Sequence, residues 1–141
     1  MIEYAKMSKA DLKARADVLE QANQQRAERQ VKKKLASLLR LLAETVRGVL
    51  RATEARHHKI AAGSVDAAAG MIGDIERVMG QFDLELSVED KMRRTIGELR
   101  KDQKTLEMAV ELKSLKDVRM VHHWLLKSVE MLGELLRLEI E

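Results

Sequence analysis

Apolar residues recur every three or four positions through most of the chain, which is the period of an amphipathic helix. Placed 100° apart around a helix, several from the first half share one face: Val31, Leu35, Leu38, Leu42, Val46, Val49 and Ile60. Ser8, with Asp11 three residues later, has the spacing of a capping box that begins a helix. No strong helix breaker follows before Gly63, so the pattern predicts one helix, or two nearly collinear ones, over residues 9–62.

The first part of this predicted helix has a different surface. Leu12 and Leu19 lie more than a quarter of a revolution away from the leucine face, and residues 20–30 offer almost nothing to bury. The helix must therefore either bend within residues 20–34 or project there from the body of the protein. We favour projection.

Three more helices are predicted, over residues 65–79, 88–112 and 115–140. Ser64 is a candidate N-cap for the second helix, and Gly80 a candidate left-handed residue at its end. Gln103 is the one polar residue on the apolar seam of the third. Ser114 either begins a fourth helix or merely interrupts a third that continues to the end of the chain.

The widths of the apolar faces indicate how the helices assemble. Residues 35–50 and 121–138 are apolar over more than a third of the helix circumference, which is more than one partner helix covers. Proline is absent, which favours long helices and few loops. We therefore predict a single all-α domain over residues 1–141. It would form an elongated helical hairpin or a four-helix-type bundle with coiled-coil-like seams, completed within the chain or by dimerisation.

Composition removes several classes of protein. The chain has no cysteine, which excludes disulfides and thiolate chemistry. Its longest leucine-rich run, residues 35–50, is interrupted by Arg40, Glu44 and Arg47 and is too polar to cross a membrane. Residues 1–9 lack the apolar core of a signal peptide. We therefore expect a cytoplasmic protein without a membrane span.

Charge is distributed unevenly behind a net charge of +3. Residues 1–60 hold 14 Lys/Arg against 7 Asp/Glu, whereas residues 61–141 hold 12 against 16. On the first helix, basic residues follow one line opposite the leucine face and are interrupted only by Glu44. The candidate binding residues on this line are Arg15, Arg26, Arg29, Lys33, Arg40, Arg47 and Arg51.

This basic line has three interpretations. It is a solvated outer face, a contact for the phosphate backbone of nucleic acid, or a contact for an acidic protein surface, including the chain's own acidic second half. Natural helix faces usually mix charges of both signs, because like charges four residues apart repel. Nucleic acid would be bound through phosphates rather than bases, because Tyr4 is the only aromatic residue in the basic half.

The chemistry-bearing residues do not form a recognisable catalytic or metal set. Glu54 and His57 match half of the Glu-x-x-His pattern of carboxylate di-iron bundles, but Arg119 and Met120 stand where His122 and His123 would need their glutamates. The methionines that are spread over the predicted helices are interpreted as core filler: Met71, Met79, Met92, Met108, Met120 and Met131. No nucleophile elbow or phosphate-binding loop is present.

These observations lead to a functional hypothesis. We expect a protein that is not an enzyme, with no cofactor, metal or small-molecule substrate. It would be a helical interaction or assembly protein, a homo-oligomer or a small subunit of a larger complex joined through apolar helix faces, with a projecting basic helix as its contact arm. The alternative is a small nucleic-acid-binding subunit that contacts the phosphate backbone without sequence specificity.

Overall fold

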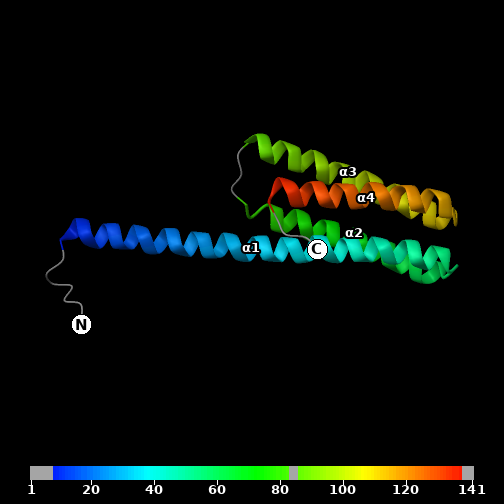
Figure 1. Cartoon of the computed structure of the whole chain (residues 1–141), viewed down its shortest axis with the longest axis horizontal. Coiled ribbons are helices and arrows are strands. Elements are labelled where there is room, and N and C mark those ends of the chain that lie inside the picture. Colours follow the sequence, from blue (N-terminus) through cyan, green and yellow to red (C-terminus); the bar gives the residue numbers. More distant parts are fainter. Residues whose placement is uncertain (1–7, 83–85, 138–141) are drawn as a thin grey trace.

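The computed structural model describes residues 8–82 and 86–137, and these form four α-helices and no strand: α1 (Lys9–Glu54), α2 (His58–Met79), α3 (Leu86–Glu111) and α4 (Leu115–Leu135). The prediction of an all-α protein is confirmed. Successive helices run in opposite directions, and each contacts two others, α1 packing on α2 and α4 while α3 packs on the same pair (Figure 1).

One hydrophobic core lies between the four helices. Each helix contributes fully buried aliphatic side chains on one face. They are spaced three residues apart at Leu39 and Leu42 and at Ile72 and Ile75, and seven apart at Leu99 and Leu106 and at Leu125 and Leu132. The core begins in α1 only at Leu35, with Val31 half-buried against its edge. The bundle therefore uses little more than the second half of α1.

The first half of α1 projects from the bundle as a helix, and we call residues 9–30 the arm. Every residue of the arm is exposed. At 1.5 Å per residue it is about 33 Å long, and Figure 1 shows it extending well beyond the ends of the other three helices. α1 passes without a break through residues 20–34. Of the two alternatives drawn from the sequence, a bend or a projection, the structure has the projection.

The first helix ends earlier than predicted, at Glu54 rather than near residue 62. Arg56 adopts a left-handed conformation with φ of 60°, and the next amide, that of His57, donates to the carbonyl of Ala52 at 2.8 Å. This is a Schellman ending, which usually has glycine at the left-handed position. Because arginine occupies it here, the reversal of the chain could not be predicted from the sequence.

The second helix consequently begins at His58, so Ser64 lies inside α2 and is not its cap. Gly80 is also not left-handed, having φ of −63°. Its amide continues the helical pattern by donating to the carbonyl of Glu76 at 3.1 Å. The last turn of α2 tightens gradually, so the backbone leaves the helix without a residue of positive φ.

α3 and α4 are separate helices that meet in a second Schellman ending. Lys113 has φ of 55°, and the amide of Ser114 donates to the carbonyl of Ala109 at 3.0 Å. Ser114 then caps α4 by accepting from the amide of Asp117 at 3.4 Å. α4 ends at Leu135 rather than near residue 140, and residues 138–141 lie outside the described residues.

Candidate functional site

The basic residues predicted as a binding line all lie exposed on α1. We call them the basic stripe: Arg15, Arg26, Arg29, Lys33, Arg40, Arg47 and Arg51. The capping box that begins α1 is formed as expected, because the hydroxyl oxygen of Ser8 accepts from the amide of Asp11 at 3.2 Å. The continuity of α1 keeps the stripe straight from the arm to the bundle.

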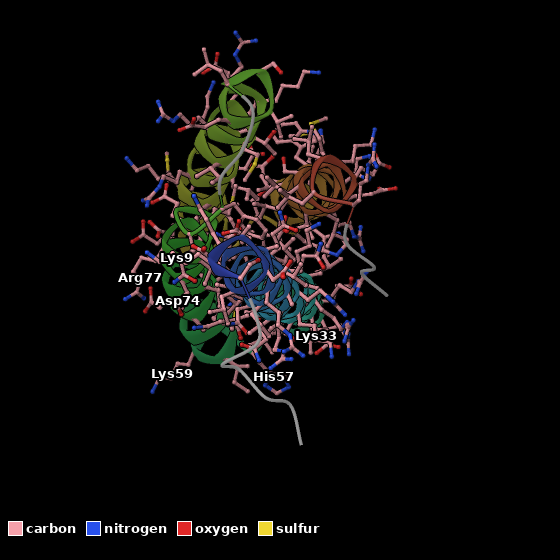
Figure 2. All side chains as sticks on the ribbon, turned by 90° about the vertical axis from the view of Figure 1, so that its left-hand side faces the viewer. Lys9, Lys33, His57, Lys59, Asp74 and Arg77 are labelled. Atoms are coloured by element: carbon pink, nitrogen blue, oxygen red, sulfur yellow. The ribbon has the colours of Figure 1, made fainter. Side chains whose placement is uncertain are left out.

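The stripe crosses the boundary between the arm and the bundle. Arg26 and Arg29 belong to the arm, Lys33 stands where the core begins, and Arg40 and Arg47 lie on the outside of the bundle. Around the boundary, α1 alone lines a shallow surface groove with Ala22, Gln25, Arg26, Arg29, Gln30 and Lys33. Figure 2 looks along the molecule from the arm's side and shows Lys33 at the periphery of α1. The stripe is thus an open surface rather than a pocket for a small molecule.

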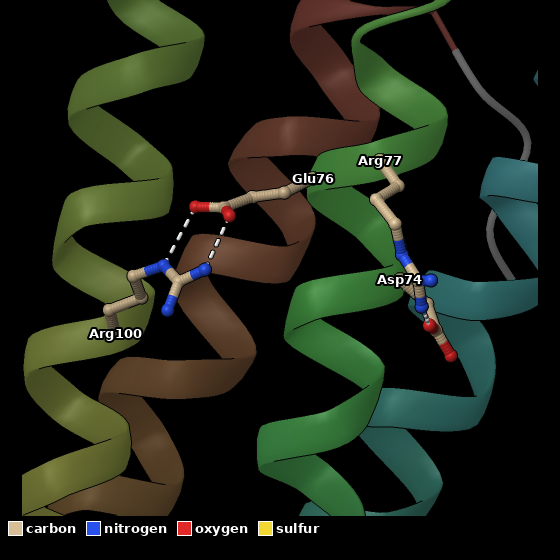
Figure 3. Close-up of polar contacts among 4 residues, drawn as sticks. All are labelled: Asp74, Glu76, Arg77 and Arg100. Carbon is tan, nitrogen blue, oxygen red and sulfur yellow. Dashed lines mark hydrogen bonds and ion pairs between the residues drawn. The ribbon is translucent and has the colours of Figure 1, made fainter.

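From Arg26 to Arg51 the members of the stripe make no ion pair or side-chain hydrogen bond with other described residues. Ion pairs within the bundle join residues of α2 and α3. Glu89 accepts from Arg93 at 2.7 Å within α3, and Asp74 pairs with Arg77 within α2 (Figure 3). From Arg26 to Arg51, the positive charge of the stripe is therefore not consumed by ion pairs with other described residues.

Arg47 lies beside carboxylates of α4. It lines the groove between α1 and α4 together with Glu130 and Glu134. Across the same helix pair, the pKa of His122 is lowered because the imidazole is partly buried, and the positive charge of Arg47 acts in the same direction. The Nε2 atom of His122 is buried and has no hydrogen-bond partner.

The histidines do not assemble a metal site. Within residues 8–82 and 86–137, no group of three or more His, Asp and Glu side chains is placed to hold a metal ion. His57 and His123 are exposed. His58 lines a groove between α2 and α3 whose charged residues are Lys59, Asp66, Glu107, Glu111 and Lys113.

The polar contacts between α2 and α3 hold these two helices together. Arg100 donates from Nε to Glu76 at 2.7 Å and pairs with its second oxygen through Nη2 (Figure 3). This hydrogen-bonded guanidinium lowers the pKa of Glu76. Deeper in the bundle, Gln103 is 4% exposed and donates to the carbonyl of Val65 at 2.7 Å, while its Oε1 atom has no partner.

The interpretation of the methionines as core filler is wrong for three of them. Met79 and Met92 are buried, but Met108, Met120 and Met131 are exposed, together with Leu112 and Trp124. These three methionines are exposed because their positions fall outside the buried face of α3 or α4. Placing them on a helical wheel beside the buried leucines would have shown this from the sequence.

Among the helices of the described residues, none contains an apolar stretch of the length that a membrane span requires. Comparison of the chain with protein-family models, with curated proteins and with solved structures finds no match in any of the three. Function must therefore be inferred from the molecule's own surfaces.

Proposed function

We propose that this protein is a non-enzymatic helical interaction protein. Its bundle is a scaffold, and the arm of α1 is the contact element that joins it to further subunits, copies of itself included. We also propose that its helices pack in coiled-coil-like seams, which the three- and four-residue spacing of the buried side chains supports.

The observation that carries this proposal is the complete exposure of the arm. All of residues 9–30 are helical and none is covered by the bundle. A helical segment that packs no apolar face gains little stability in water, because most helical stability in proteins comes from such packing. A partner that covers the arm would supply that packing.

Exposed apolar side chains support the same proposal. Leu12, Val18 and Leu19 are exposed on the arm, at 41%, 64% and 63% of their surface. Single exposed leucines are ordinary on protein surfaces, but these three lie within two turns of each other on the arm, none of whose residues is buried. They are the side chains through which another helix would pack on the arm.

Self-association of the full chain tests the proposal. We expect light scattering to give a mass above the 16.0 kDa of one chain, rising with concentration, and hydrogen exchange of the arm amides to slow in parallel. The variant L12S/L19S should shift toward the monomer. L41S/I60S is the matched control, because Leu41 and Ile60 are also exposed apolar residues but lie on the bundle.

Two results would contradict the proposal. A compact 16.0 kDa species at the highest soluble concentration, with arm amides that exchange as fast as those of an unfolded peptide, would contradict assembly through the arm. So would equal loss of association in L12S/L19S and in its control.

A further inference from the structure

We infer that the basic stripe binds the phosphate backbone of nucleic acid along α1 from Arg26 to Arg51. This inference rests on the proposed function, because it names the chemistry of one partner of the contact arm.

The shape of the stripe suits an extended polyanion. Its charges lie on one straight helix over about 38 Å, with successive rises of about 4.5 to 10.5 Å between neighbouring cations. All but one of its members are arginine, whose planar guanidinium donates two parallel hydrogen bonds to a phosphate. Long side chains on an exposed helix can follow a backbone of phosphates without a preformed pocket.

Most carboxylates of the arm lie away from this face. At 100° per residue, Asp17, Glu20 and Glu28 lie more than a third of a revolution from the centre of the stripe. Asp11 shares the direction of the stripe, but it precedes Arg26 by 15 residues. Glu44 is the one carboxylate within the stripe. From Arg26 to Arg51, six cations therefore face one carboxylate on this side of α1, and Glu130 and Glu134 of α4 lie beside Arg47.

The surroundings of the stripe favour phosphate over an acidic protein. Stable protein–protein interfaces have an apolar centre, whereas interfaces with nucleic acid are more polar and more positively charged. The groove around Arg26, Arg29 and Lys33 is otherwise lined by Ala22, Gln25 and Gln30, with no large apolar side chain. The leucines of the arm lie nearer its tip, so they leave this part of the surface to a polar partner.

Binding through phosphates has a measurable signature. Six cations from Arg26 to Arg51 that each displace a counterion predict a slope of about −5 for the logarithm of the binding constant against the logarithm of salt concentration. Affinity would then fall about a thousandfold between 50 and 200 mM salt. Unrelated base sequences should bind alike, because neither aromatic side chain in the described ranges, Phe82 or Trp124, lies on α1.

Fluorescence anisotropy of the full chain with a labelled DNA duplex of about three helical turns tests the inference. The variant R26E/R29E/K33E/R40E should bind at least about a hundredfold more weakly at 50 mM salt. The matched control is K91E/R94E/K104E/K116E, which changes net charge equally at exposed positions of α3 and α4 and should stay within about tenfold of the wild type. Circular dichroism checks the helicity of each, and the corresponding Gln variant at the four stripe positions replaces the Glu variant if it unfolds.

Several results would overturn the inference: no binding at 50 mM salt, equal weakening in the two variants, or a preference of more than tenfold between unrelated duplexes. Tighter binding to poly-L-glutamate than to the duplex at equal salt would assign the stripe to an acidic protein instead. Light scattering of the same samples separates this inference from the proposed function. An assembly that persists but binds no duplex rejects the phosphate contact alone, and a monomer that binds duplex rejects self-association alone.

Discussion

The same substitution, leucine to alanine, made in each half of α1 measures how much packing in that half contributes to the free energy of unfolding. Leu42 is fully buried in the bundle, whereas Leu19 on the arm keeps 63% of its surface exposed. Changing each leucine to alanine removes the same atoms and leaves a good helix former in both places. Any difference in the free energy of unfolding therefore reports packing rather than helix propensity.

The expected magnitudes follow from burial. Removing the buried carbons of Leu42 forfeits about 2.4 kcal/mol of transfer free energy, at about 0.8 kcal/mol for each methylene equivalent. The cavity left in the core adds to this, so we expect L42A to cost about 3 to 4 kcal/mol. L19A should cost less than about 1 kcal/mol, because little surface is covered and the substitution leaves no cavity.

Urea unfolding followed by circular dichroism supplies both numbers, and it should be run at low and high protein concentration. At low concentration the two costs should differ about threefold or more. If the arm packs on other subunits, the cost of L19A should rise with concentration while that of L42A stays the same. A cost of 2 kcal/mol or more for L19A at the lowest concentration, or of less than about 1 kcal/mol for L42A, would refute the assignment of arm and core.

Three further predictions address the bundle. The pKa of His122 is lowered from about 6.5 by burial and by Arg47. The contribution of neutral His122 to stability is therefore complete above about pH 6.5 and is lost as the pH falls through 6.5 and below. Urea unfolding from about pH 8 to 5 should show this loss of stability, and the H122Q variant should lack it. Because Gln103 has an unpaired buried oxygen beside its bond to Val65, Q103L should leave stability unchanged or raise it, and a loss above about 2 kcal/mol would contradict this. Because Lys113 is left-handed, K113G should raise the free energy of unfolding by up to about 1 kcal/mol, and thermal unfolding at a lower temperature than the wild type would argue against strain there.

The sequence alone predicted the helical class and the faces of the helices. The buried positions Leu35, Leu42, Val46 and Val49 of α1 are among those that the periodicity placed on one face. Periodicity works here because the side of a helix that faces the core is determined by residue spacing of 3.6 per turn. The exposure of the basic stripe follows from the same geometry, because its members stand opposite the leucines.

What the sequence could not determine was where the chain turns back. Helix ends are recognised from glycine, proline and capping residues, and the endings at Arg56 and Lys113 have neither glycine nor proline at the left-handed position. A long helix and a helical hairpin have the same local propensities in these segments. The bundle decides between them, because folding back after Glu54 buries Ala61 and Val65 against the core that α1 begins.

The tertiary structure also decided the status of the arm. A polar stretch such as residues 20–30 is compatible with a bend, a loop or a free helix, since each leaves its side chains in water. The arm projects because the other three helices cover α1 only from about Val31 onward. The charges were readable from the sequence, but only the extent of the core shows that the amino-terminal part of the stripe stands on an element that the bundle leaves uncovered.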